Sequence, residues 1–194
     1  MRSQFWTAPN QITLLRLIFV PFVIIKILDR NFKFALLLFV LAGISDALDG
    51  LLARWLHQQS MLGQYLDPIA DKLLLSSAFL VLSFTRQIPW RYTVLVLSRD
   101  LCILLIAAVL YITSNIRDFK PSVFGKLNTG AQIAAIFFVL LWRVIPAPWI
   151  GIARHSFLVA TLILTCVSAL HYILITGQKL HSNGESGPPA APSR

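Results

Sequence analysis

The 194-residue chain is 57% hydrophobic and only 13% charged, with a mean hydropathy of +0.73, which excludes an ordinary soluble domain and indicates a polytopic membrane protein. At roughly 20 apolar residues per span, its length fits one bundle of about six transmembrane helices. The net charge of +9 does not indicate nucleic acid, because the basic residues are spread singly along the chain and suit a protein lying against anionic lipid.

The first half of the chain predicts three spans. Span one covers about residues 12–28, after a turn and helix cap at 8–10, and we expect it to be retained because no small-residue cleavage site follows it. Polar residues 29–31 separate it from span two, at about residues 34–56. Span three covers about residues 63–84. Pro68 either kinks this span or marks its first turn, because proline lacks the N–H that would bond to the Gln64 carbonyl.

Three further spans are expected in the second half. Span four, about residues 92–113, contains Arg99 and Asp100, a costly charge pair that should face the bundle interior, either on a functional pathway or as a structural ion pair. A polar and basic stretch, 114–129, precedes span five at about residues 130–145, and span six covers about residues 156–175. The expected fold is thus an all-α polytopic membrane protein with one domain, residues 1–177, and a disordered tail, residues 178–194.

Acidic residues concentrate where spans two and three are joined. Four of the eight acidic residues fall between positions 46 and 71. Five residues before the junction share one helical face, at offsets 0, 3, 4, 7 and 8: Asp46, Asp49, Gly50, Ala53 and Arg54. After the junction, Gly63, Asp67 and Asp71 recur every four residues on a second face. Residues 55–62 resemble the turn of a helical hairpin, so the two faces can meet.

Four carboxylates in one volume repel one another and lose water unless cations lie between them. The sequence therefore predicts two divalent cations, Mg²⁺ or Mn²⁺, held by Asp46, Asp49, Asp67 and Asp71. Small residues on the same faces let a bulky ligand approach, and Arg54 adds a fixed positive charge. Such a site suits a diphosphate, whose bridging oxygen gains charge during transfer. Asp71, at the end of the row, can act as general base towards a hydroxyl nucleophile.

The pattern D-x2-D-G-x2-A-R-x8-G-x3-D-x3-D, from Asp46 to Asp71, resembles the signature of the CDP-alcohol phosphatidyltransferase family, and every fixed position is matched. The resemblance implies a six-helix membrane enzyme that displaces CMP from a CDP-linked lipid, using two divalent ions and an alcohol acceptor in a polar cavity open to the cytoplasm. It implies that the four aspartates hold the metals and that Asp71 is the base. The positions implied to surround the CDP group are Gly50, Ala53, Arg54 and Gly63.

The acceptor is less well defined by the sequence. Three flanking stretches resemble the branch with phosphatidylglycerophosphate synthases and CDP-diacylglycerol-dependent cardiolipin synthases: Pro9-Asn10-x2-Thr13-x2-Arg16, Asp67-Pro68-x2-Asp71-Lys72 and Gly125-Lys126-x2-Thr129. In that branch Arg99 and Lys126 would bind the acceptor phosphate, while Asn10 and Thr13 either contact CDP or only cap span one. Glycerol 3-phosphate is favoured over phosphatidylglycerol. However, Arg99-Asp100 stands where glycerophosphate enzymes would have Arg-Glu, which also suits the cardiolipin branch.

A transporter or ion channel is the alternative from another class, since intramembrane carboxylates often mark ion paths. The acidic residues form one cluster and not a chain across the bilayer, which favours the enzyme. A weak excess of Lys and Arg places the acidic end in the cytoplasm, and the lack of an Arg- and Ser-rich transit peptide favours a bacterial plasma membrane. The expected partners are CDP-diacylglycerol, the acceptor and the bilayer, with a homodimer left open and no nucleic acid.

Overall fold

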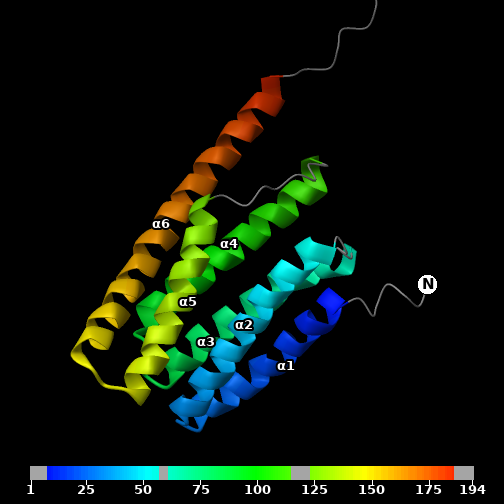
Figure 1. The fold of residues 1–194 in the computed structure, drawn as a ribbon. Coiled ribbons are helices and arrows are strands. Elements are labelled where there is room, and N and C mark those ends of the chain that lie inside the picture. The colour runs from blue at the N-terminus through cyan, green and yellow to red at the C-terminus, as the bar shows by residue number, and fades with distance from the viewer. Residues whose placement is uncertain (1–7, 57–60, 115–122, 186–194) are drawn as a thin grey trace, which may run out of the picture.

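The computed structural model describes residues 8–56, 61–114 and 123–185, and among them the side chains of 17–45, 72–102, 105 and 125–170. The described residues form six helices: α1 Ala8–Leu28, α2 Phe32–Leu56, α3 Met61–Phe84, α4 Trp90–Ser114, α5 Val123–Val144 and α6 Pro148–Glu185. The helices run side by side, and the turns at 29–31, 85–89 and 145–147 lie together at the lower left of the bundle (Figure 1). The predicted all-helical fold is confirmed.

Two of these turns are closed by an arginine in the left-handed conformation. Arg30, with a φ of 56°, follows α1, and Arg86, with a φ of 60°, follows α3. After Arg30, the Asn31 amide donates to the Lys26 carbonyl at 2.9 Å, and the equivalent bond after Arg86 joins residues 87 and 82 at 2.7 Å. This is the Schellman arrangement, in which glycine is usual because a Cβ makes the left-handed backbone costly. Each chain reversal is therefore short, and consecutive helices run antiparallel.

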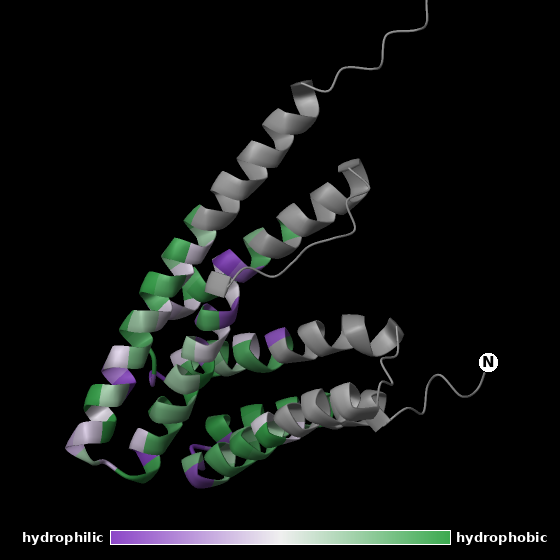
Figure 2. Cartoon of the chain, turned by 45° about the horizontal axis from the view of Figure 1, so that its top comes forward, coloured by the Kyte–Doolittle hydropathy of each residue, from purple (hydrophilic) through white to green (hydrophobic). Residues whose placement is uncertain are grey.

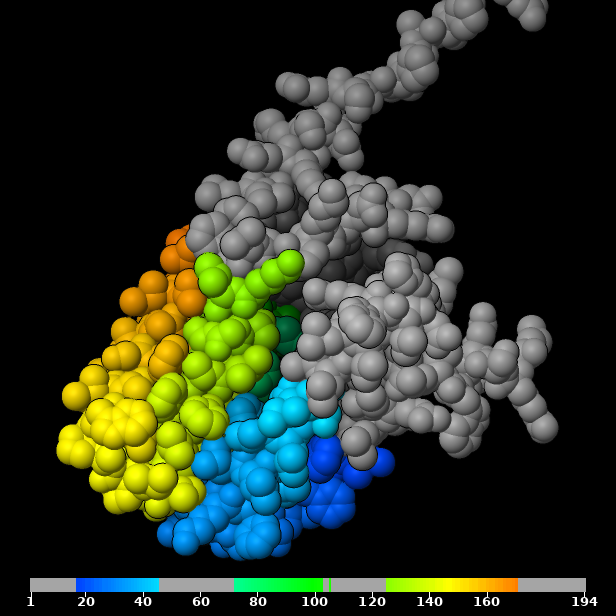
Figure 3. All heavy atoms as spheres, viewed as in Figure 1, coloured from blue at the N-terminus to red at the C-terminus, as the bar shows by residue number. Residues whose placement is uncertain are grey.

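The core forms where α5 lies between α6 and α2 (Figure 3), while α1 packs on α2 and α3, and α4 packs on α3 and α6. Buried apolar residues from all six helices contribute to it: Val23, Phe39, Phe79 and Leu140 are examples, each 5% exposed or less. At the start of α6, Gly151 lets the backbone approach α5 closely, because a Cβ there would lie 2.9 Å from the Trp142 ring.

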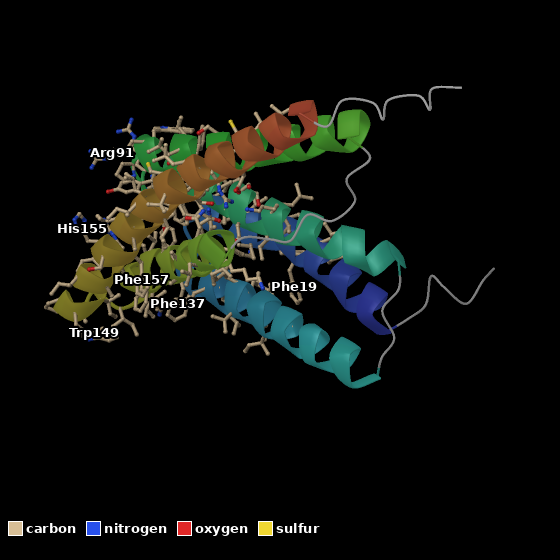
Figure 4. The ribbon with its side chains drawn as sticks, turned by 90° about the horizontal axis from the view of Figure 1, so that it is seen from above. Phe19, Arg91, Phe137, Trp149, His155 and Phe157 are labelled. Atoms are coloured by element: carbon tan, nitrogen blue, oxygen red, sulfur yellow. The ribbon has the colours of Figure 1, made fainter. Side chains whose placement is uncertain are left out.

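Near the α5–α6 turn the packing between these two helices is aromatic. Phe138 stacks on Phe157 with ring centroids 5.1 Å apart, and Phe137 meets Phe138 edge to face at 5.3 Å. Figure 4 shows Phe137 and Phe157 between the two helices, with Trp149 and His155 at the outer edge of the same end. This end of the bundle is therefore held by ring packing between α5 and α6.

The outside of the bundle is apolar as well. Each of the six helices exposes large apolar side chains, for example Phe22, Leu37, Phe84, Leu105, Ile133 and Ile163, all more than 40% exposed. Figure 2 shows the same hydrophobic character along the described parts of the helices. Soluble monomers rarely expose so much apolar surface, whereas lipid tails are as apolar as leucine. The protein is therefore an integral membrane protein.

Two helical segments are long and apolar enough to cross a membrane on their own, Gly125–Val144 and Pro148–Leu170. Three shorter apolar helical segments also occur among the described residues, Leu17–Leu28, Phe32–Ser45 and Lys72–Phe84. They coincide with parts of the first three predicted spans. That all six helices cross the membrane, and that a polar cavity opens to one side, stay predictions.

Several predicted helix boundaries were wrong. Helix α3 begins at Met61, so Pro68 lies inside the helix and does not mark its first turn. Helix α5 begins at Val123, so Lys126 and Thr129 belong to the helix and not to the preceding polar stretch. The Thr129 hydroxyl donates to the Gly125 carbonyl at 3.1 Å, the i to i−4 bond typical of a helix interior.

The first and last helices also extend beyond their predicted boundaries. Helix α1 begins at Ala8, so Asn10 lies in its first turn and not before it. Helix α6 begins at Pro148, a residue suited to a first turn, and continues through Glu185, with no proline to interrupt it. The predicted tail is thus helical at 178–185, and residues 186–194 lie outside the described chain.

Candidate functional site

The predicted metal site falls on two successive helices. Asp46 and Asp49 lie in the C-terminal half of α2, and Asp67 and Asp71 lie in the N-terminal half of α3. Because both segments are helical, as predicted, each pair shares one face of its helix. The side chains of these aspartates lie outside the described ones, so their convergence on metal ions stays a prediction. The described side chains, which do not include these four, contain no group of three or more His, Cys, Asp or Glu suited to a metal.

The predicted CDP-binding positions lie on the same helices and on α1. They are Gly50, Ala53 and Arg54 on α2, Gly63 on α3, and Asn10 and Thr13 on α1. Helix α1 packs against both α2 and α3. Three helices in contact therefore carry all the residues predicted to hold the nucleotide, while the placement of those side chains lies outside the described part of the chain.

A charged network begins at the residue after Asp71. Lys72 Nζ lies 2.8 Å from Asp100 Oδ1 and joins α3 to α4. The same oxygen accepts a hydrogen bond from Arg99 Nη1 at 2.7 Å, and Arg99 Nη2 donates to Ser168 Oγ on α6 at 2.7 Å. The side chains of Arg99 and Asp100 are 6% and 7% exposed, and that of Lys72 is 32% exposed. The predicted charge pair therefore faces the bundle interior, which confirms its orientation.

Polar contacts continue from α6 onto α5. Thr165, one turn from Ser168, donates through Oγ1 to Asn128 Oδ1 at 3.1 Å, and Gln132 follows Asn128 by one turn on the same face of α5. These four residues are 2% exposed or less. Nitrogen and oxygen atoms of side chains gather between α3, α4, α5 and α6 in Figure 4. We call the following seven residues the inner polar cluster: Lys72, Arg99, Asp100, Asn128, Gln132, Thr165 and Ser168.

Five polar atoms of the inner polar cluster are buried without a hydrogen-bond partner among the described residues. Three are donors, Arg99 Nε, Asn128 Nδ2 and Gln132 Nε2, and two are acceptors, Asp100 Oδ2 and Gln132 Oε1. Each such atom costs about 1–3 kcal/mol, and most buried polar atoms in folded proteins are paired. The two cations, Lys72 and Arg99, face one anion, Asp100, which leaves one net positive charge. The cluster is therefore suited to a ligand that is negatively charged and both accepts and donates hydrogen bonds.

The two residues predicted for the acceptor phosphate lie in different surroundings. Arg99 belongs to the inner polar cluster and is buried, whereas Lys126 lies near the start of α5 and is exposed. Asn128, two residues further along α5, is fully buried. The described contacts therefore connect Arg99 with the helix that carries Lys126 through α6, by way of Ser168 and Thr165. A shared role in binding phosphate stays a prediction.

Lys72, Asn128 and Gln132 belong to the cluster although the sequence alone predicts no role for them. A signal for Gln132 was present, because it is the one amide in the otherwise apolar segment 131–142, and polar residues within a span usually face the bundle interior. The partners could not be read from spacing. Ser168 and Thr165 lie 69 and 37 residues from Arg99 and Asn128 along the chain, and only the packing of α6 against α4 and α5 brings them together.

Comparison with known proteins agrees with the signature. The family model described as CDP-alcohol phosphatidyltransferase matches residues 6–176. The chain is 35% identical over 149 residues to the human cardiolipin synthase (CMP-forming), covering 68% of this chain and 49% of that protein. It is 32% identical over 179 residues to a probable phosphatidylglycerophosphate synthase of Mycobacterium tuberculosis, covering 89% and 82% of the two chains.

A third relative is the CDP-diacylglycerol–glycerol-3-phosphate 3-phosphatidyltransferase of Aquifex aeolicus, 31% identical over 170 residues, with 86% of this chain and 93% of that protein covered. The chain spans about half the length of the animal cardiolipin synthases that it matches, and most of the length of the two bacterial relatives. Because the family model covers nearly all the described residues, the protein belongs to the CDP-alcohol phosphatidyltransferase family.

Proposed function

We propose that the protein transfers the phosphatidyl group of CDP-diacylglycerol to an alcohol acceptor and releases CMP. The observation that carries the proposal is the complete signature between Asp46 and Asp71, which falls on the helical segments of α2 and α3 within the matched family region. The Aquifex relative supports it, since its name gives CDP-diacylglycerol as donor and glycerol 3-phosphate as acceptor. A transporter would need no such signature.

In the proposed reaction the acceptor hydroxyl oxygen attacks the phosphorus that carries the diacylglycerol. A new P–O bond forms, the P–O bond to the CMP phosphate breaks, and CMP leaves with the electron pair of that bond. The hydroxyl proton goes to Asp71, which lies one helical turn beyond Asp67. The next residue, Lys72, lies 2.8 Å from Asp100 on α4, and this contact between α3 and α4 supports the proposed role of the turn that carries the base.

The donor set fits divalent cations, because Asp46, Asp49, Asp67 and Asp71 offer only carboxylate oxygens, the ligands that Mg²⁺ and Mn²⁺ prefer. When bound, such ions neutralise the diphosphate and stabilise charge on the leaving oxygen. The residues proposed to bind the CDP group are Gly50, Ala53, Arg54, Gly63, Asn10 and Thr13.

Glycerol 3-phosphate is the proposed acceptor. Two relatives named for this chemistry match over 82% and 93% of their length, and the positive inner polar cluster with Arg99 suits an acceptor phosphate. Phosphatidylglycerol is the second candidate, because the human cardiolipin synthase shows a higher identity, 35%, although over less of this chain. Lys126, exposed near the start of α5, is proposed to bind the same phosphate.

We further propose that all six helices cross a bacterial plasma membrane, with the acidic end in the cytoplasm. Apolar side chains exposed on every helix support the spans. Trp90 and Trp149, 51% and 62% exposed, begin α4 and α6, at the end of the bundle opposite the C-terminus of α2 (Figure 1). Exposed tryptophans mark membrane interfaces, so the aspartates of α2 and α3 would lie towards the other face.

The test is CMP release by purified protein given CDP-diacylglycerol, Mg²⁺ and either glycerol 3-phosphate or phosphatidylglycerol. We expect turnover with glycerol 3-phosphate; turnover with phosphatidylglycerol alone would establish the second candidate. Asp67→Asn should leave less than about a tenth of the activity, because a metal-held diphosphate depends on that charge, and chelation should act reversibly. Asp29→Asn is the matched control, since Asp29 is 56% exposed beside Lys26. Folded protein that releases no CMP with either acceptor would refute the proposal.

A further inference from the structure

We propose that the inner polar cluster binds the glycerol unit of the acceptor, and that the Gln132 and Asn128 amides recognise the hydroxyl that does not react. This inference rests on the proposed function and adds the chemical group that the site selects. Gln132 is fully buried with both its amide nitrogen and its amide oxygen unpartnered, and Asn128 is fully buried with its amide nitrogen unpartnered.

The unpartnered atoms define the ligand. A hydroxyl accepts one hydrogen bond and donates another, so it can pair with Gln132 Nε2 and Oε1 at once. A fully ionised phosphate only accepts, which would satisfy Arg99 Nε but leave Gln132 Oε1 and Asp100 Oδ2 unpaired. An acyl chain would satisfy none of them. The ligand that fits the whole set carries both an anionic phosphate and free hydroxyls.

Described contacts connect the charged part of this set with the turn of α3 that carries the proposed base. Asp71 is followed by Lys72, which contacts Asp100, and the adjacent Arg99 contacts Ser168. One turn along α6, Thr165 contacts Asn128 on α5. Described contacts therefore run from the turn that carries the proposed base to α6, and from the next turn of α6 to Asn128 on α5, one turn before Gln132.

No described contact of Gln132 explains why an amide is buried at this position. Arg99 and Asn128 each make a hydrogen bond to α6, to Ser168 and Thr165 respectively, whereas the Gln132 amide makes none to another helix within the described part of the chain. Stability alone would favour an apolar residue of similar volume at this position, because a buried amide without partners destabilises the fold. The presence of the amide is explained if a ligand supplies the missing hydrogen-bond partners.

Glycerol 3-phosphate and the headgroup of phosphatidylglycerol share this chemistry. Both contain a glycerol unit on a phosphate, and in both a primary hydroxyl can attack while the secondary hydroxyl remains. The secondary hydroxyl is therefore the group assigned to the amides, whichever acceptor the protein uses. An acceptor with a primary hydroxyl but no secondary one provides a direct probe of this assignment.

The experiment compares each acceptor with its analogue lacking the secondary hydroxyl: glycerol 3-phosphate with 3-hydroxypropyl phosphate, and phosphatidylglycerol with phosphatidyl-1,3-propanediol. We expect the wild-type protein to prefer the natural acceptor by about tenfold or more in kcat/KM. In Gln132→Met the preference should fall to about twofold or less. Thr161→Val is the matched control, because Thr161 is buried in the same helix pair but donates to the Phe157 carbonyl of its own helix. Gln132→Met that keeps the wild-type preference would overturn the inference.

A binding measurement separates this inference from the proposed function. Glycerol 3-phosphate, or phosphatidylglycerol in mixed micelles, should raise the Tm of the wild-type and Thr161→Val proteins by more than that of Gln132→Met, in which Arg99 can still bind the acceptor phosphate. Without acceptor, Gln132→Met should be at least as stable as wild type, and Gln132→Leu serves in its place if it does not fold. An equal acceptor-induced Tm rise in wild type and Gln132→Met would overturn the site. Absence of CMP release by wild type would instead refute the proposed function and leave this Tm comparison valid.

Discussion

Replacement of Asp100 by asparagine should be among the most destabilising single changes in the inner polar cluster. Asp100 Oδ1 lies 2.8 Å from Lys72 Nζ and 2.7 Å from Arg99 Nη1, and the Asp100 side chain is 7% exposed. Unit charges about 4 Å apart attract by about 4 kcal/mol at an effective dielectric constant of about 20. Asp100→Asn leaves Arg99 buried and uncompensated, so we expect the free energy of unfolding to fall by about 3–5 kcal/mol.

The matched comparison is Lys72→Met, which removes the other cation. Lys72 is 32% exposed, and its loss leaves Asp100 paired with Arg99, so the expected cost is only about 1 kcal/mol. Replacing both buried charges, Arg99→Met with Asp100→Leu, should recover much of the stability lost in Asp100→Asn. Reversible unfolding in mixed micelles of mild detergent and SDS, followed by tryptophan fluorescence, measures all three. If Asp100→Asn costs no more than Lys72→Met, the buried anion does not stabilise the cluster as argued.

Three further changes test other parts of the molecule. Asp71→Asn should still bind CDP-diacylglycerol, measured directly by calorimetry, but lower kcat for CMP release by a factor of roughly 10² to 10⁴ at saturating Mg²⁺; full activity would remove its role as base. Gly151→Ala should lower the free energy of unfolding by about 1–3 kcal/mol because its Cβ would lie 2.9 Å from Trp142, whereas Gly130→Ala, with nothing within 4 Å, should be neutral or stabilising; equal effects would contradict the packing argument. Arg86→Gly should raise the free energy of unfolding by about 1 kcal/mol, and with it the Tm, because glycine adopts the left-handed backbone with a φ of 60° without steric strain. A lower Tm would mean that the arginine side chain stabilises the fold by more than this strain destabilises it.

The helical architecture was predictable because hydrophobicity and chain length determine it in a membrane. The apolar segments of the sequence correspond to helices, and the Arg99–Asp100 pair lies inside the bundle as predicted. Helix ends were predictable only in part. The polarity of Lys126 and Gln178 predicts a loop and a tail, but both residues are good helix formers, and a helix can continue beyond its apolar segment.

The signature residues of the site were also predictable, because their spacing within each helix is local. Asp46 and Asp49 lie together on α2, and Asp67 and Asp71 lie together on α3. The contacts of the inner polar cluster were not predictable in this way. These contacts depend on which faces of α3, α4, α5 and α6 pack together. Packing between segments that are distant in the sequence produces no periodic pattern from which it could be predicted.

The two halves of the bundle divide the proposed chemistry between them. Helices α1, α2 and α3 carry the residues proposed for the metals and the CDP group, while α4, α5 and α6 carry those proposed for the acceptor, apart from Lys72 on α3. The hydrogen bond from Lys72 to Asp100 crosses this division at the residue next to the proposed base. The acceptor hydroxyl must lie at this boundary, since it has to reach both Asp71 and the phosphorus of the donor. Electrostatic attraction and hydrogen bonds are stronger where water is excluded, so on this proposal the buried cluster would select the acceptor by its phosphate and hydroxyl groups, which lipid tails lack.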